Sequence, residues 1–147
     1  THAEADLVAW GVSSIGSVGL CYSQNVKTLD EYYDRLDQGE LPVARGFKLN
    51  MDDVLRRFII QMLMCNFELS IRSLEQAYPI TFNAYFATEL EQLRELANMG
   101  LLTVDDEWIS ITLKGRLLIR NVCMVFDRYL QQARRLQSEP VRYSRTV

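Results

Sequence analysis

The chain has 147 residues, of which 48% are hydrophobic and 24% are charged, and its net charge at pH 7 is −3. This length and composition are typical of a folded domain, and they exclude a disordered chain or a fibre. The small negative charge gives no field that would attract nucleic acid or an anionic membrane, and no apolar stretch has the roughly 18 residues of a membrane span.

The first part of the chain predicts a strand, a helix and a connector. Residues 7–12 form a short apolar run that is typical of a strand. Thr28 is followed three residues later by Glu31, which predicts a capping box at the start of a helix that ends at Gly39. Residues 40–49, which contain proline and glycine, favour an extended connector.

Three helices are predicted from residue 50 onwards. Asn50 can cap the first of them, and its apolar side chains recur at helical spacing on one expected buried face: Met51, Val54, Leu55, Phe58, Ile59 and Met62. Ser70 is predicted to cap a shorter second helix that ends by Pro79. The third helix is expected to run from Thr81 to Gly100.

A β-hairpin and a long last helix complete the predicted domain. Apolar and polar residues alternate over residues 102–111, which indicates a hairpin. Thr112 is predicted to cap a helix that runs to roughly Arg135, with an irregular tail at residues 138–147. The expected fold is mainly α with a small hairpin, and residues 50–137 form a winged-helix-like domain.

A winged-helix arrangement often binds DNA, with the helix before the hairpin in the major groove. In residues 81–98 the charged side chains are Glu89, Glu91 and Glu95 against Arg94 alone. An acidic helix repels phosphates, which supply most of the affinity for duplex DNA. We therefore expect a packing module rather than a nucleic-acid partner.

The cysteines and the single histidine argue against a metal site or a self-sufficient active site. Cys21, Cys65 and Cys123 lie far apart in the sequence and form no Cys-x-x-Cys motif. They are expected to be reduced and buried, as in a cytoplasmic protein. His2 is the only histidine, so a histidine-based nucleophile is not expected.

Positive charge gathers at the end of the chain. Residues 114–147 contain eight cationic side chains, seven of them arginine, against Asp127 and Glu139. This stretch is either a solvated face or a surface for an acidic ligand or partner domain. Arg116 and Arg120 lie four residues apart, so a helix would place them on one face, where pairing with carboxylates of the domain is the alternative to ligand binding.

Several motifs in order resemble one enzyme family over nearly the whole chain. They are Gly11-Val-Ser-Ser-Ile15, Tyr22-Ser-Gln-Asn25 with Glu31-Tyr-Tyr33, Arg56-Arg57, Cys65-Asn-Phe67, Tyr85-Phe86, Gly115-Arg-Leu-Leu-Ile-Arg-Asn121, Cys123-Met124 and Phe126-Asp127. Together they resemble the C-terminal part of the oxygen-independent coproporphyrinogen III oxidases, which are radical S-adenosylmethionine enzymes of haem biosynthesis.

The resemblance implies a partial (β/α) barrel upstream, with a [4Fe–4S] cluster held by a Cys-x-x-x-Cys-x-x-Cys motif. Cleavage of S-adenosylmethionine there yields a 5′-deoxyadenosyl radical, and two propionates of coproporphyrinogen III lose CO2 to give protoporphyrinogen IX. The cluster motif is absent from this chain. Residues 1–49 are therefore expected to be the last barrel strand, a helix and a connector of a fragment that binds no cluster and is inactive alone.

The resemblance also implies site residues. Ile15 would lie beside a second S-adenosylmethionine, with Gly11 and Ser13 as neighbours. Arg116 or Arg120 would position propionates of the substrate or dock the domain onto the upstream barrel. The alternatives are a related radical S-adenosylmethionine protein that binds or transfers haem, and a stand-alone winged-helix module for protein interaction or DNA binding. An unpaired strand in residues 1–20 could also cause artefactual dimers.

Overall fold

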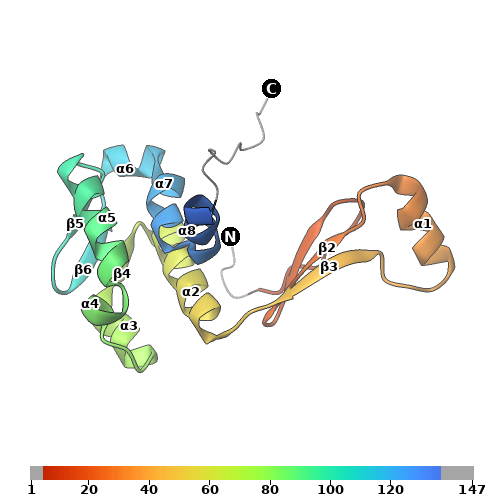
Figure 1. Ribbon diagram of the computed structural model, residues 1–147, viewed down its shortest axis with the longest axis horizontal. Coiled ribbons are helices and arrows are strands. Elements are labelled where there is room, and N and C mark those ends of the chain that lie inside the picture. The colour runs from red at the N-terminus through yellow and green to blue at the C-terminus, as the bar shows by residue number, and fades with distance from the viewer. Residues whose placement is uncertain (1–4, 137–147) are drawn as a thin grey trace. The chain divides into compact units, whose positions relative to one another are not determined.

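The computed structural model describes residues 5–136, so the predicted tail at residues 138–147 lies outside the described residues. The chain divides into two compact units, Thr1–Leu55 and Arg56–Val147. Figure 1 shows the elements of each unit along the chain. The division falls inside helix α2 (Met51–Asn66), whereas the second domain is predicted to begin at residue 50.

The first unit is built on a three-stranded antiparallel sheet, with the order β1-β2-β3. Its elements are β1 (Ile15–Val18), β2 (Cys21–Asn25), α1 (Leu29–Asp37) and β3 (Val43–Lys48). The predicted strand at residues 7–12 is wrong, because only Leu7 pairs there, in an isolated bridge to Ser17. The predicted connector at residues 40–49 is mostly strand β3, because its backbone completes the ladder of β2.

The helices of the first unit begin and end close to the predicted residues. Helix α1 follows Thr28, but the predicted capping box does not form, because the Thr28 side chain makes no cap hydrogen bond and Glu31 pairs with Arg35 at 2.9 Å. Gly39 ends the helix with a φ of +74°, which glycine adopts without steric cost. At the start of α2, Asn50 and Asp53 form a reciprocal cap, in which each backbone N–H donates to the other side chain at 2.9 Å.

The second unit begins with the predicted helices, but a short strand that was not predicted lies between the first two, and the third helix is broken. Its first elements after α2 are β4 (Glu68–Ser70), α3 (Ile71–Ala77), α4 (Phe82–Tyr85) and α5 (Ala87–Asn98). Ser70 caps α3 by accepting a hydrogen bond from the Ser73 backbone at 3.2 Å. The predicted third helix is two helices, because Phe86 between them leaves the helical region with a ψ of +31°.

A buried aromatic cluster explains the position of that break. Phe86 contacts Phe82, with ring centroids 5.0 Å apart, and Phe126 at 5.5 Å in an edge-to-face arrangement. All three rings are fully buried. The core around them is aliphatic and includes Ile59, Leu63, Leu69, Leu74, Leu93, Leu102, Ile109 and Val122. Met51, predicted on the buried face of α2, is 71% exposed.

The predicted hairpin is confirmed as β5 (Leu102–Val104) and β6 (Trp108–Ile111). Strand β4 pairs with β6 on its other side, so the second sheet has the order β4-β6-β5. The described residues thus contain two three-stranded sheets beside their helices, whereas only one hairpin is predicted from the sequence.

The predicted long last helix is wrong, since this segment is four short helices. They are α6 (Leu113–Leu117), α7 (Ile119–Cys123), the 3-10 helix η1 (Met124–Phe126) and α8 (Arg128–Leu136). The helical path breaks at Leu118, with φ −116° and ψ +24°, and again at Asp127, with ψ +93°. The Asp127 carboxylate accepts a hydrogen bond from the Leu130 backbone at 2.9 Å and so caps α8.

Candidate functional site

The glycine- and serine-containing loop before β1 is held in place by two side chains from later elements. Gly11 and Ser13 both have positive φ angles, +86° and +57°. The buried Asn25 amide donates to the Gly11 carbonyl at 2.9 Å, and the Tyr32 hydroxyl accepts from the Gly11 N–H at 3.0 Å. The loop backbone is therefore held by side chains of strand β2 and helix α1.

Ile15 follows this fixed loop as the first residue of β1, and its side chain is 59% exposed. The next residue, Gly16, is packed tightly, because a Cβ there would lie 3.0 Å from the Ser23 hydroxyl and 3.1 Å from the Leu7 carbonyl. Trp10, on the other side of the loop, is 81% exposed. The first unit thus presents apolar side chains to solvent from a rigid backbone.

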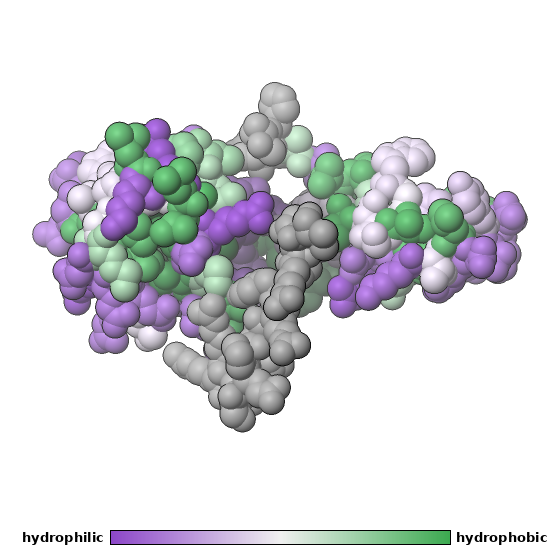
Figure 2. Space-filling model, turned by 90° about the horizontal axis from the view of Figure 1, so that it is seen from above, coloured by the Kyte–Doolittle hydropathy of each residue, from purple (hydrophilic) through white to green (hydrophobic). Residues whose placement is uncertain are grey.

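Arg116 and Arg120 do not share a helix, so the basis of their predicted common face is wrong. Arg116 lies in α6 and Arg120 in α7, on either side of the break at Leu118. The Arg116 guanidinium lies over the Phe67 ring, 4.5 Å from its centroid. Both arginines are exposed, beside Leu117, which is 86% exposed. Figure 2 shows hydrophobic and hydrophilic side chains together on this face of the second unit.

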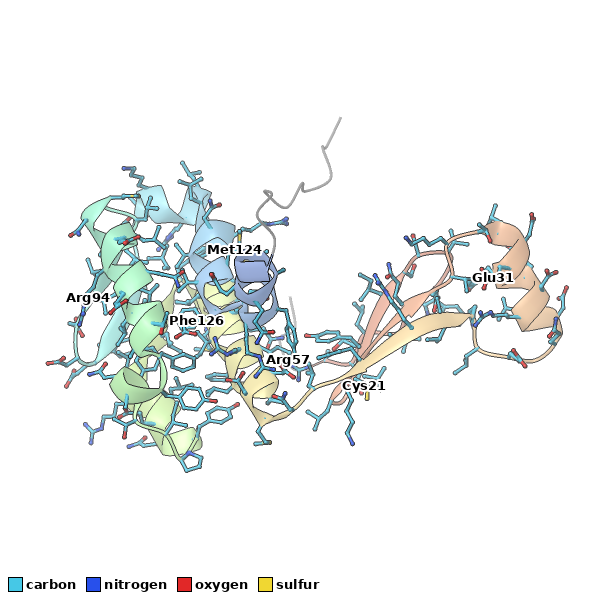
Figure 3. All side chains as sticks on the ribbon, in the orientation of Figure 1. Cys21, Glu31, Arg57, Arg94, Met124 and Phe126 are labelled. Carbon is cyan, nitrogen blue, oxygen red and sulfur yellow. The ribbon has the colours of Figure 1, made fainter. Side chains whose placement is uncertain are left out.

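The cysteines form no metal site in the described part of the chain. Cys21 and Cys65 are exposed, which corrects the expectation that all three thiols are buried, and Cys123 alone is buried. Figure 3 shows Cys21 on the first unit. Burial raises the pKa of the Cys123 thiol to about 11, so this thiol stays protonated at neutral pH. Among residues 5–136 no group of three or more histidine, cysteine or acidic side chains could hold a metal ion.

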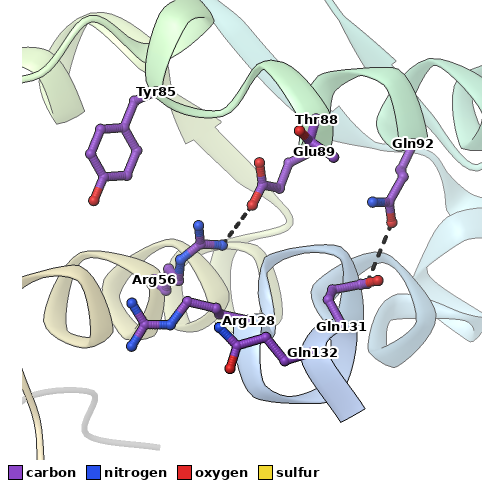
Figure 4. A pocket seen from close by; sticks show the side chains of 8 residues that line it. All are labelled: Arg56, Tyr85, Thr88, Glu89, Gln92, Arg128, Gln131 and Gln132. Atoms are coloured by element: carbon purple, nitrogen blue, oxygen red, sulfur yellow. Dashed lines mark hydrogen bonds and ion pairs between the residues drawn. The ribbon is translucent and has the colours of Figure 1, made fainter. Parts of the chain in front are cut away.

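A polar groove of about 270 Å³ lies in the second unit among α2, α5 and α8. Figure 4 shows the eight residues that line it: Arg56, Tyr85, Thr88, Glu89, Gln92, Arg128, Gln131 and Gln132. Arg56 donates to the Glu89 carboxylate at 2.8 Å and to the Phe126 carbonyl at 3.2 Å, and its guanidinium lies 5.1 Å from the centre of the Phe86 ring.

This groove was not predicted from the sequence. Arg56 was noted only within a family motif, and Glu89 only as part of an acidic helix. Their positions in the sequence could have indicated them, because Arg56 directly follows the buried Leu55 and Glu89 directly precedes the buried Leu90. A charged side chain at the edge of a buried face needs a partner, and here the two charges, each about 14% exposed or less, supply it for one another.

No helix in the described residues is long and apolar enough to cross a membrane.

The chain matches known proteins in both sequence and structure. Residues 49–118 match the family model of the HemN C-terminal domain. The chain is 45% identical over 137 residues, 93% of its length, to the oxygen-independent coproporphyrinogen III oxidase of Escherichia coli, and 43% identical over its full length to that of Pseudomonas aeruginosa. It covers 30% and 31% of these two relatives.

A solved structure agrees with these sequence matches. The chain is similar to coproporphyrinogen III oxidase (HemN) from Escherichia coli, described as a radical SAM enzyme, with a TM-score of 0.80 and 46% identity. The match covers 86% of this chain and 29% of that one. This chain therefore spans less than a third of the length of these two relatives and of this solved structure.

Proposed function

We propose that this chain serves as the C-terminal part of an oxygen-independent coproporphyrinogen III oxidase, because residues 49–118 match the HemN C-terminal domain model and 137 residues of the chain are 45% identical to one such enzyme. The reaction would be the oxidative decarboxylation of two propionates of coproporphyrinogen III to vinyl groups. The observation that carries the proposal is the match to the solved enzyme, at 46% identity and a TM-score of 0.80 over 86% of this chain.

The [4Fe–4S] cluster of the enzyme would be held outside the described residues. The two exposed cysteines and the buried Cys123 do not gather into a ligand set, and the raised pKa of Cys123 opposes the thiolate that a metal needs. We therefore assign the cluster, and the radical that S-adenosylmethionine supplies there, to the upstream barrel. The described residues would bind and orient the substrate, and they would exclude water from it.

The fixed loop at residues 11–14, with Ile15 after it, is the part of this chain that we place nearest to the chemistry. Its backbone is held by Asn25 and Tyr32, and Ile15 is exposed beside it. An exposed apolar side chain on a rigid loop can pack against a flat adenosyl group without any rearrangement. Ile15 would therefore contact a second S-adenosylmethionine, with the backbone at Gly11 and Ser13 shaping the edge of that site.

The second unit would serve as the cover, with a winged-helix-like arrangement used for packing. Strand β4 joins the hairpin as a third strand, and α5 precedes the hairpin, as in a winged helix. Glu89 in α5 is already paired with Arg56, and the helix carries more acidic than basic side chains, which argues against DNA. Arg116 and Arg120 would dock the cover on the barrel or meet substrate propionates.

A chimera tests the role of Ile15. We would replace the homologous C-terminal part of the Escherichia coli enzyme with this chain and compare Ile15→Ala with Val18→Ala, an exposed apolar residue of the same strand. We expect Ile15→Ala to lower the anaerobic rate of decarboxylation about tenfold or more and Val18→Ala to leave it within about twofold. Equal rates for both variants would remove Ile15 from the site.

A further inference from the structure

Three residues lie in one row across the sheet of the first unit, on one of its two faces. Ile15 of β1 is paired with Gln24 of β2, and Gln24 is paired with Arg45 of β3. Residues that are paired in neighbouring strands point to the same face of a sheet. Neighbouring strands lie about 4.8 Å apart, which places the Cα atoms of Ile15 and Arg45 about 10 Å from each other, on either side of Gln24.

The Arg45 guanidinium is held by Gln24 and, through it, by the loop before β1. The Nε–H and Nη2–H groups of Arg45 both donate to the side-chain oxygen of Gln24, the first of them at 2.8 Å. The amide nitrogen of Gln24 donates to the Ser13 carbonyl at 3.2 Å. Both ends of the Gln24 side chain therefore connect Arg45 to the loop that precedes Ile15. An arginine that is already held loses less conformational entropy when a ligand binds.

The positive charge of Arg45 is not neutralised by any carboxylate within residues 5–136. The residue forms no ion pair in this part of the chain, and its hydrogen-bond partner Gln24 is neutral. Strands β1, β2 and β3 contain no acidic residue. A guanidinium has five N–H donors, and Gln24 accepts from two of them, so the others are available to a ligand. Two parallel N–H donors match the two oxygens of a carboxylate.

The other end of the row is apolar. Ile15 is 59% exposed, and Leu7 is 58% exposed and bridged to Ser17, which lies on the same face as Ile15. The face thus presents apolar side chains at β1 and a cationic group at β3. This combination fits a ligand that has an apolar body and a carboxylate at its edge.

The opposite face of the sheet shows the contrast. Its neighbouring row consists of Gly16, Ser23 and Gly46, which are paired with one another in the same way and carry no charge. Lys48, two residues after Gly46, lies on this opposite face at the other end of β3. The two cations of β3 therefore belong to different faces, and Arg45 alone shares a face with Ile15.

We propose that the Ile15–Gln24–Arg45 row is one binding face, in which Arg45 binds a carboxylate of the ligand whose apolar body contacts Ile15. Gln24 is a positioning residue that orients Arg45. The identity of the ligand rests on the proposed function, which brings two carboxylate-bearing molecules to this chain. S-adenosylmethionine has one carboxylate on its methionine part, and coproporphyrinogen III has four propionates. Both offer the same chemistry to Arg45.

The chimera with the Escherichia coli enzyme tests the proposal through binding instead of turnover. Anaerobic equilibrium dialysis with labelled S-adenosylmethionine counts the molecules bound per chain and gives their dissociation constants. Fluorescence titration gives the dissociation constant of coproporphyrin III, the stable oxidised form of the substrate. The variants are Arg45→Gln, Arg45→Lys and Gln24→Ala, and the matched control is Lys48→Gln, an exposed cation of the same strand on the opposite face. Far-UV circular dichroism checks that each variant is folded.

We expect Arg45→Gln to weaken the binding of one ligand about tenfold or more, and Lys48→Gln to leave both dissociation constants within about twofold. Gln24→Ala and Arg45→Lys should weaken the same ligand by less, because the first keeps the guanidinium and the second keeps the charge. A loss at the second of two S-adenosylmethionine sites identifies the methionine carboxylate as the partner of Arg45. A loss for coproporphyrin identifies a propionate.

Unchanged binding of both ligands by Arg45→Gln, or equal losses in Arg45→Gln and Lys48→Gln, would overturn the proposal. An unsubstituted chimera that binds neither ligand would also overturn it. The proposed function fails in a different way, with an unsubstituted chimera that binds both ligands but releases no CO2. In that case the comparison of the variants still decides whether Arg45 binds a carboxylate.

Discussion

Gly115 is the position at which a single added methyl group should disturb the second unit most. It is buried at the centre of α6, and a Cβ there would overlap the Leu101 carbonyl oxygen and lie 2.9 Å from the Ile111 side chain. The same carbonyl accepts hydrogen bonds from the backbone and the hydroxyl of Thr112, both at 3.1 Å. Gly115→Ala must therefore move α6 away from Leu101 and weaken this junction.

The expected loss of unfolding free energy in Gly115→Ala follows from three contributions. Overpacking costs about 1–3 kcal/mol, and the two hydrogen bonds to Leu101 contribute about 1 kcal/mol each. Alanine is favoured over glycine inside a helix by about 1 kcal/mol, which acts in the opposite direction. The clash outweighs the helix propensity, so we expect Gly115→Ala to lower the free energy of unfolding by about 3 kcal/mol.

Urea denaturation followed by fluorescence measures this loss. Trp108 lies in β6 of the second unit, so a Trp10→Phe background makes the signal report that unit alone. The control is Gly100→Ala, where φ is +74° and no atom lies within 4 Å of the added Cβ, so that only backbone strain of about 1–2 kcal/mol is expected. A Gly115→Ala loss no larger than that of the control would refute the packing argument.

Four further predictions concern the same chain. Glu89→Gln should lower the free energy of unfolding by about 3 kcal/mol, because it leaves the Arg56 charge buried without its carboxylate; a thermal or urea transition that does not shift would contradict this. Asn50→Ala should cost about 1 kcal/mol by removing a helix cap, as measured by urea denaturation with both tryptophans present. Cys123 should resist Ellman's reagent at neutral pH until the chain unfolds, while the two exposed thiols react at once. Because its folded pKa of about 11 is raised, the stability linked to this thiol should be complete below pH 9 and lost as the pH rises toward 11, and Cys123→Val should remove that loss.

Local signals predicted the helix ends better than the helix lengths. Gly39 and Gly100 end helices with positive φ, and Ser70 caps one, as their residue types indicate. The prediction of one long last helix was wrong because tertiary contacts decide the path of this segment. Gly115 is held against Leu101, and Phe126 packs on Phe86, and one straight helix did not satisfy both contacts.

The first sheet was missed because its strands lack the usual alternation. Residues 15–18 contain glycine and serine, and β1 turns into β2 through Gly19, which has a φ of +55°. The loop motif could be found from the family resemblance. The hydrogen bonds of Asn25 and Tyr32 to Gly11 could not be predicted, because they join residues that are 14 and 21 positions apart. The Arg56–Glu89 pair spans 33 positions, and no periodicity of a single helix indicates such a contact.

The most direct test of the central claim is the product of the unsubstituted chimera. The chimera, with this chain in place of the C-terminal part of the Escherichia coli enzyme, would be purified without oxygen and given coproporphyrinogen III, S-adenosylmethionine and a reductant. We expect two molecules of CO2 for each substrate consumed and protoporphyrinogen IX as the product. A folded chimera with a complete cluster that binds S-adenosylmethionine but releases no CO2 would contradict it.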